Sequence, residues 1–493
     1  MNQPENTESN PTFTRREILQ GAGVLLGASL LGCDAEPGQS GAENLLAPGA
    51  STARRRIAIV GGGAGGIGAA YLLSPQHDVE IFEAGSKIGG HCDSRVVEYK
   101  GVKVNVDLGA QFFHPDTHPS YVSLLEELGL YNPDNPKSDE SIEAPGSICI
   151  FAKNAFLPVF SSKHPYLTPF FAVDFLIYSQ YARNVILQNQ SWEMTLAEWV
   201  GSLPVTQKFK DSLVFPWISA TIGTTIENAK RSSARSILQT FALAFPANIF
   251  AGASTFNSAL GLEGNLRRML DRSPGVQVNV NSAVQGLSYQ DGNWTVQTAS
   301  GNHGPYSAVV MNAPPQISKT LLQPLAWASD IVPVLNKYET FETRMLIHTD
   351  AKYANRDKNF WAVYNGMVEG SACEGSIWYG GIHEKLPTGG TLDIFKSWAS
   401  RRSADPANII YERRFHHPLI TPEGIRAART MRGFQGRNSL YFSGQAMTGF
   451  DLQESALYSA MKVAETLAPT SSTLASLKAR MVKRGRKNIN YDL

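Results

Sequence analysis

Residues 57–91 contain three glycines and one acidic residue whose spacing is suited to binding a ligand. Gly61, Gly63 and Gly66 come directly after the apolar run IAIV, and Glu83 follows the run DVEIF, 22 residues after Gly61. Glycines at these places permit a tight turn, a close approach of the backbone to a ligand, and close packing of a helix on a strand. A helix N-terminus attracts phosphate, and an acid placed like Glu83 accepts hydrogen bonds from a ribose. The pattern predicts a site for a dinucleotide without a 2'-phosphate.

Strands and helices must hold these residues in place. RRIAIV is typical of a buried parallel strand, GAAYLL after the glycines indicates a helix, and DVEIFEA indicates a second strand. Near the C-terminus, residues 440–443 predict a further strand, which is followed by Gly444 and a long helix. A small face on that helix, buried against the sheet, is predicted by the helical spacing of Ala456, Ala460, Ala464 and Leu467.

A third segment of strands lies between these two ends. Residues 276–301 alternate polar and apolar side chains on both sides of Asp291 and Gly292, a pair that signals a two-residue hairpin turn. The segment continues into YSAVVMNAPP. The sequence therefore predicts an α/β fold in which a Rossmann-type domain is assembled from separated segments, with an interleaved α+β substrate domain.

A second glycine motif follows Glu83 directly. GSKIGGH, from Gly85 to His91, resembles the RxGGR motif of the flavin-containing amine oxidase superfamily, with Lys87 and His91 at the two basic positions. That motif implies FAD rather than NAD. VNVDLGAQFFHP, residues 104–115, resembles the DxGA stretch that runs beside the flavin ring in this superfamily.

The C-terminal half carries the rest of the resemblance. Gly444 and Gln445 stand where the superfamily has AGE or AGD, and Val284 stands where its adenine-side strand contacts the adenine edge. The glycine pattern and the resemblance together assign to FAD the residues Gly61, Gly63, Ala64, Gly66, Glu83, Ala84, Gly89, Gly90, His91, Gly109, Ala110, Gln111, Val284, Gly444, Gln445 and Leu452.

Segments outside the cofactor motifs narrow the resemblance. Residues 346–365 and the segment FHHPLITPEGIRAARTMRGFQGRNSLYFSGQ are similar to bacterial FAD-dependent oxidoreductases within the superfamily, whose activities are largely unassigned. The segments GGHCDS and QGR…FSGQAM are also similar to polyenoic fatty acid isomerases. The resemblance thus implies an FAD-dependent oxidoreductase. The alternative is a double-bond isomerase of polyunsaturated fatty acids that leaves the flavin unchanged overall.

The resemblance also indicates one candidate catalytic residue. Many superfamily members carry a lysine that is hydrogen-bonded through water to flavin N5, some twenty residues past the position of Pro315. Lys337 is nearest to that place, and the local register leaves Glu339 as the alternative. The aromatic pair that sandwiches an amine in relatives is incomplete, since only Phe450 or Leu452 stands near its C-terminal member.

Two adjacent histidines and one cysteine could be reactive, but we expect them to have structural roles. His416 and His417 are adjacent, so on a strand they face opposite ways, and we expect one buried and one exposed histidine. Cys92 follows His91, and we expect a small buried residue rather than a nucleophile.

The substrate segments are rich in apolar residues. YLTPFFAVDFLIYSQYA, residues 166–182, and FALAFPANIF, residues 241–250, indicate either a plain helical core or an apolar cavity. A cavity suits a hydrophobic amine, an acyl chain or an isoprenoid. We therefore expect hydride transfer from an apolar amine or an unsaturated, lipid-like substrate to flavin N5, with oxygen or another electron acceptor. A flavin-bearing binding lipoprotein is the alternative of another class.

The N-terminus has the composition of an export signal. Arg15 and Arg16 precede an apolar run, residues 21–32, that is too short to span a bilayer. The arginine pair resembles a twin-arginine signal, and LLGC, ending at Cys33, resembles a lipobox whose cysteine receives a lipid. We expect an exported protein, periplasmic or at the cell surface, anchored to a bacterial membrane through Cys33.

Composition excludes several classes of function. The 493 residues carry a formal net charge of +1, and the body of the chain has no basic groove, so nucleic acid is not an expected partner. The four cysteines form no CxxC pair and HExxH does not occur, so we expect neither a metal site nor a disulfide scaffold.

These observations divide the chain into five parts. We expect the C-terminal part to be a solvated, partly disordered basic tail, with contact to anionic lipid as the alternative. The parts are a signal, 1–33; a linker, 34–53; an FAD-binding domain, 54–135, 261–321 and 396–469; a substrate domain, 136–260 and 322–395; and the tail, 470–493.

Overall fold

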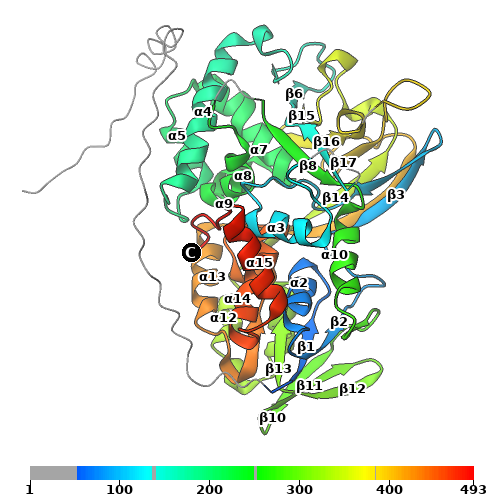
Figure 1. Ribbon diagram of the computed structural model, residues 1–493. Coiled ribbons are helices and arrows are strands. Elements are labelled where there is room, and N and C mark those ends of the chain that lie inside the picture. The colour runs from blue at the N-terminus through cyan, green and yellow to red at the C-terminus, as the bar shows by residue number, and fades with distance from the viewer. Residues whose placement is uncertain (1–52, 136–139, 249–251, 384) are drawn as a thin grey trace, which may run out of the picture.

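The computed structural model describes residues 53–135, 140–248, 252–383 and 385–493 (Figure 1). The predicted export signal, with Arg15, Arg16 and Cys33, lies outside the described residues. Two sheets dominate the described part, one in the lower half of the view with its helices and one in the upper half beside a helical layer. Among the described helices, none is both long enough and apolar enough to cross a bilayer.

The first sheet is parallel and has the order β19-β13-β1-β2-β9. Its strands come from three distant parts of the chain, as predicted, and β1 is buried on both faces, since Ile57 and Ile59 pack in one core cluster and Ala58 and Val60 in another. The strands are β1 (Arg56–Val60), β2 (Asp78–Phe82), β9 (Val276–Asn279), β13 (Ala308–Met311) and β19 (Leu440–Phe442). The α/β fold class and the Rossmann-type domain are thereby confirmed.

Two helices pack closely on this sheet. Helix α2 (Ala64–Leu73) follows the glycine turn, and helix α14 (Gln453–Leu467) follows β19. A Cβ built on Gly68 of α2 would lie 3.4 Å from the Cβ of Ala460. The small face predicted on the C-terminal helix therefore packs mainly against α2, and only in part against the sheet.

The predicted hairpin is present as part of a three-stranded antiparallel sheet, β10-β11-β12. Gln290 pairs with Asn293, and Asp291 and Gly292 have positive φ angles of 48° and 80°. Both central residues of a type I′ turn require positive φ, which explains why this dipeptide is found here. The strands are β10 (Gly286–Gln290), β11 (Asn293–Thr298) and β12 (Gly301–Tyr306).

The second large sheet has seven strands in the order β18-β14-β17-β16-β15-β6-β7. A layer of helices lies beside it in the upper left of Figure 1, comprising α4 (Pro169–Leu187), α5 (Leu196–Ser202), α7 (Phe215–Ile222), α8 (Ile226–Arg231) and α9 (Ala234–Gln239). The strands are β6 (Ile148–Ala152), β7 (Phe160–Ser161), β14 (Glu339–His348), β15 (Tyr364–Glu369), β16 (Ala372–Trp378), β17 (Phe395–Trp398) and β18 (Ile409–Leu419).

Shorter elements connect the two sheets. The pairs β3-β4 and β5-β8 form separate two-stranded sheets. The remaining elements used below are β3 (Ser94–Tyr99), β4 (Val102–Asp107), β5 (Ser141–Pro145), β8 (Ser254–Ser258), α3 (Pro119–Leu128), α10 (Gly261–Asp271), α11 (Pro315–Leu322), α12 (Ile331–Leu335), α13 (Pro422–Arg432) and α15 (Ser472–Lys483).

One predicted domain boundary differs from the structure. Residues 396–419 were expected in the FAD-binding domain, but β17 and β18 both pair with β14 in the seven-stranded sheet. The pairing of β14 with β18 runs from Glu339 opposite Leu419 to His348 opposite Ile409. Pairing between strands so distant in sequence leaves no local signal, so the sequence could not show which sheet receives them.

The prediction that the C-terminal part is a solvated, partly disordered basic tail is wrong. Residues 472–483 form helix α15, whose Leu474, Leu477 and Met481 are buried at helical spacing. Arg484 and Arg486 form ion pairs with Glu126 of α3. These two positive charges are therefore used in ion pairs within the protein, and an apolar stripe docks the helix against α3 and α2.

Helix α15 offers a test of this docking. Leu477→Ala removes a fully buried side chain and is expected to lower the free energy of unfolding by about 2–5 kcal/mol. Val482→Ala, on the same helix at a position 81% exposed, is the matched control and should change it by less than about 0.5 kcal/mol. Urea denaturation followed by tryptophan fluorescence measures both, and equal effects would contradict the docked helix.

Candidate functional site

The glycine turn has the geometry that the sequence predicted. Gly61 has a φ of +104°, and a Cβ on Gly66 would lie 2.1 Å from the carbonyl oxygen of Gly61. Gly63 is the N-cap of α2, and no side chain caps that helix. The first N–H groups of α2, beginning at Ala64, therefore have no capping side chain and are free to bind an anion such as a pyrophosphate.

Glu83 lies at the carboxyl end of β2, beside the turn. Its Oε2 accepts a hydrogen bond from Gly62 N at 2.7 Å, and its Oε1 accepts one from Gly85 N at 2.7 Å. These bonds hold the carboxylate next to the start of α2, where an adenosine ribose is expected. Ala84 follows it at an exposed position.

The second glycine motif packs directly against the first. Gly63 and Gly89 form a parallel β-bridge, and Gly89 and Gly90 have φ angles of +119° and +59°. A Cβ on Gly89 would lie 2.4 Å from Cys92 O, so glycine is needed there. Lys87 does not point to a free site, because its Nζ lies 2.5 Å from both Asp93 Oδ1 and Glu263 Oε2.

Asn312, directly after β13, also lies at the glycine turn. It was not predicted from the sequence. Asn312 Nδ2 donates to Gly61 O at 3.2 Å, and Asn312 Oδ1 accepts from Ser443 Oγ at 3.1 Å. Gly444, with a φ of +78°, places its N–H on Ser459 Oγ at 2.7 Å. The ends of β1, β13 and β19 thus meet at the N-terminus of α2. The sequence NAPP, directly after β13, could have indicated Asn312 as a site residue.

Two other assigned residues lie at the edges of this region. Val284 lies half-buried in the connection between β9 and β10. Leu452 is the N-cap of α14, and its N–H donates to Ser455 Oγ at 3.1 Å. Gln445 lies in the short helical turn after β19, and its side chain is outside what the structure describes.

These residues fit the phosphates and adenosine half of a dinucleotide. An α2 N-terminus without a capping side chain lies beside a carboxylate that suits a ribose, and the backbone closes so tightly at Gly61, Gly66 and Gly89 that side chains are excluded. Such a surface is shaped for backbone contact with a ligand rather than for side-chain packing.

The DxGA stretch lies beside a buried lysine from the other sheet. Lys396, on β17, is 2% exposed and its Nζ donates to Gly109 O and, at 3.3 Å, to Gln111 Oε1. Gly109 and Ala110 lie against His91, since Ala110 N donates to His91 O at 3.0 Å and a Cβ on Gly109 would lie 1.9 Å from that oxygen.

Burial controls the proton affinity of this lysine. It lowers the pKa of Lys396 to about 8, and the nearby Asp107 carboxylate partly opposes that effect. Burial likewise raises the pKa of Asp107 to about 6. A lysine amine with this pKa can hold or release a proton near neutral pH.

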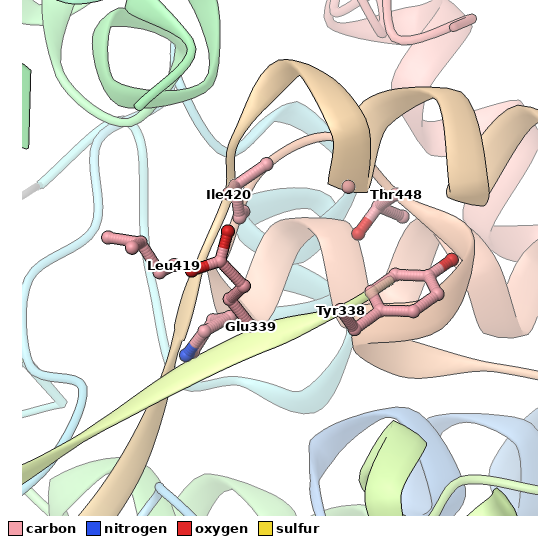
Figure 2. Close-up of a pocket in the computed structure, with 7 residues that line it drawn as sticks. Tyr338, Glu339, Leu419, Ile420 and Thr448 are labelled. Atoms are coloured by element: carbon pink, nitrogen blue, oxygen red, sulfur yellow. The ribbon is translucent and has the colours of Figure 1, made fainter. Parts of the chain in front are cut away.

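Lys337, the predicted catalytic residue, lies elsewhere. It is half exposed, and its Nζ is paired with Glu423 Oε1 at 2.8 Å. Its neighbours Tyr338 and Glu339 line a cavity of about 10 Å³, room for roughly one water molecule, at the point where β14 begins and β18 ends (Figure 2). Lys396, the buried lysine beside the DxGA stretch, did carry a sequence signal, because it is a charged side chain inside the apolar run IFKSW.

A cluster of polar side chains lies near Lys396. His91, His417 and Asp451 bring their side-chain nitrogen and oxygen atoms within 4.8 Å of one another. Burial lowers the pKa of both histidines and raises that of Asp451, although all three side chains remain accessible to solvent.

The expectations for the remaining reactive side chains hold. His416 is exposed whereas His417 is half-buried, as alternation on a strand requires. Cys92 is buried and unpaired, and burial raises its thiol pKa well above the usual range, so it is not a nucleophile.

Comparison with known proteins identifies the family. The model of the family described as flavin containing amine oxidoreductase matches residues 64–345, more than half of the chain. No curated protein matches.

Solved structures share the fold at low identity. A CLA-producing fatty acid isomerase from P. acnes is 15% identical with a TM-score of 0.59, covering 83% of this chain and 98% of that chain. A protein provisionally named protoporphyrinogen oxidase from Exiguobacterium sp. 255-15 is 15% identical with a TM-score of 0.56, covering 87% and 99%. A redesigned putrescine oxidase is 14% identical with a TM-score of 0.57, covering 84% and 99%.

The family match and the geometry agree. The three segments that meet at the N-terminus of α2 are those expected to hold FAD, and Lys396 lies against the stretch expected beside the flavin ring. The chain belongs to the flavin-containing amine oxidoreductase family and is an FAD-dependent oxidoreductase.

Proposed function

We propose that this enzyme removes hydride from an unsaturated, lipid-like substrate that carries an acidic head group. The observation that carries the proposal is a groove of about 600 Å³ where strands β6 and β7 of the second sheet meet helix α4. Its apolar lining includes Phe160 of β7, Phe175 and Leu176 of α4, and Phe245. Lys163 is the one charged residue among those that line it.

The charge of the groove favours an acid over an amine. A carboxylate gains from the Lys163 ammonium, whereas the ammonium of an amine is repelled by it and meets no carboxylate among the lining residues. Tyr166 and Phe170, 71% and 74% exposed, continue the apolar surface outside the groove. Long apolar chains would find contact area along this whole surface.

Strand β8 connects the groove with the flavin stretch. Ala253, just before β8, lines the groove, and Asn257, within β8, accepts a hydrogen bond from Gln111 Nε2 at 2.9 Å. Gln111 in turn contacts Lys396. A continuous set of contacts therefore links the groove to the buried Lys396.

In the reaction the substrate loses one hydride and one proton. FAD supplies the two-electron acceptor when it is bound. Lys396 Nζ, neutral above its pKa of about 8, takes the proton as a new carbon–carbon double bond forms. The groove holds the chain of the substrate, and Lys163 binds its head group.

An anaerobic titration tests this function. Polyunsaturated fatty acids should bleach the flavin absorbance, whereas the matched fatty alcohols should need higher concentrations and long-chain amines should not react. Lys163→Met should raise KM for the acids at least about tenfold with little change in kcat, which corresponds to about 1.4 kcal/mol of head-group binding. Lys208→Met, an exposed position, is the control.

The outcomes separate the possible activities. Lasting bleaching with a new double bond supports the dehydrogenase. A shifted double bond without lasting bleaching replaces it with the isomerase, which returns the hydride to the same molecule. Bleaching by amines alone overturns the proposal.

The proposal includes export and a lipid anchor. Arg15 and Arg16 suit a route that accepts folded cargo, which a protein loaded with FAD in the cytoplasm needs, and Cys33 is the acceptor of the lipid. A membrane anchor would keep the enzyme beside lipid-like substrates. Mass spectrometry of the processed chain tests this, and an N-terminus that begins before Cys33 would contradict it.

A further inference from the structure

We propose that the exposed apolar face around Tyr166 and Phe170, at the rim of the groove, docks on the surface of a lipid bilayer that contains anionic lipid. This inference rests on the proposed function, because it says how a lipid-like substrate reaches the groove. Tyr166, Leu167 and Phe170 are 71%, 41% and 74% exposed. Pro165 before them and Ala172 after them both line the groove. The three side chains therefore lie beside it.

The connection between β6 and β7 adds a second exposed apolar pair. Phe156 and Leu157 lie in this connection and are 63% and 59% exposed. Phe160 of β7 stacks on Phe175 of α4, with ring centroids 5.2 Å apart at 22°, and both line the groove. Two elements that line the groove and pack on each other thus present large apolar side chains to solvent. Exposed apolar side chains gathered in this way mark contact sites for a membrane or for another protein.

The charges of this segment favour a membrane. Residues 145–187 contain Lys153, Lys163 and Arg183, and their one acid, Asp174, is fully buried. The outer surface of the segment therefore presents apolar and cationic side chains and no carboxylate of its own. Lysine is depleted at contacts between proteins, whereas cationic side chains beside exposed aromatic and aliphatic ones are typical of segments that lie on anionic lipid.

Docking through this face would place the groove against the lipid. A fatty acid in a bilayer leaflet has its carboxylate at the surface and its chain in the apolar interior. Lys163 is exposed and lines the groove, so it would lie at the depth of the head groups. The acyl chain would then pass from the leaflet into the groove along an apolar surface, which keeps it shielded from water.

A dye at position 170 tests the docking in the flavin-loaded full-length protein. Cys33→Ala removes the proposed lipid acceptor, and Phe170→Cys carries a red-emitting dye that is sensitive to polarity. The other cysteines are buried and remain unlabelled; they are Cys92, Cys149 and Cys373. Vesicles of phosphatidylcholine and phosphatidylglycerol in equal parts should shift the dye emission to shorter wavelengths. Vesicles of phosphatidylcholine alone should need a higher lipid concentration for the same shift.

Substitutions beside the dye measure what the apolar side chains contribute. Tyr166→Ser combined with Leu167→Ser should raise the lipid concentration at half-maximal shift at least about tenfold. Leu187→Ser, at the C-terminal end of α4 and 48% exposed, is the matched control and should leave that concentration unchanged. The same dye at Val482→Cys on α15, 81% exposed, should not respond to vesicles.

Three results would overturn the proposal. They are a dye at position 170 that does not respond to vesicles, an equal response at position 482, and a shift without lipid that grows with protein concentration, since a second copy of the chain would then cover the face.

The binding assay contains no substrate, so its failure is distinguishable from failure of the proposed function. Turnover of dispersed fatty acids without a vesicle response would overturn the docking surface and leave the proposed function standing. A vesicle response in a protein whose flavin is bleached by amines alone would overturn the proposed function and support the docking surface.

Discussion

Replacing Lys396 by methionine should lower the rate of flavin reduction at least about 100-fold, the usual size of a general acid–base contribution, while FAD stays bound. Lys396 is the buried amine that bonds Gly109 O and Gln111 Oε1, and methionine fills its volume without a proton to exchange. Because the neutral amine accepts the proton, the rate should rise with pH through about 8 in the unmodified enzyme. The rate of flavin reduction in the variant should not show this rise with pH. Stopped-flow absorbance from pH 6 to 10 measures both effects.

Lys337→Met is the matched control for this experiment. Lys337 is half exposed and paired with Glu423, so its loss should change the rate by less than about twofold and leave the pH profile unaltered. A Lys396→Met rate within threefold of the unmodified enzyme, with the same pH limb, would exclude Lys396 as the proton acceptor.

Local chemistry explains which parts of the site could be predicted from the sequence. Gly61, Gly66 and Glu83 act through neighbours in the same strand–turn–helix unit, so their spacing alone specifies what they do. The hairpin at Asp291 and Gly292 is equally local, since two positive φ angles are needed within two residues. In each case the cause lies inside one short window of the chain.

The parts that could not be predicted depend on long-range pairing. Lys396 reaches Gly109 only because β17 pairs with β14 and β16 in the second sheet, and no window of sequence contains that pairing. The cluster of His91, His417 and Asp451 has the same origin. Helix α15 was misjudged because its charges were visible in the sequence, whereas its partner Glu126 on α3 was not.

Gly66→Ala should reduce the FAD content of the purified protein at least about tenfold. A Cβ at Gly66 would lie 2.1 Å from the backbone oxygen of Gly61, so α2 must move away from β1 and carry its N-terminal N–H groups away from the pyrophosphate. The ratio of absorbance at 450 and 280 nm measures FAD content, and thermal unfolding measures the accompanying loss of stability.

Gly68→Ala, two residues further along the same helix, separates this steric effect from helix propensity. Both substitutions replace a helical glycine by alanine, which by itself favours the helix by about 1 kcal/mol. At Gly68, however, the nearest atom to the new Cβ is Cδ1 of Leu457 at 3.3 Å, a side-chain end that can yield. Gly68→Ala should therefore retain FAD. Equal retention by both variants would mean that the close approach of α2 to the turn is not what holds the cofactor.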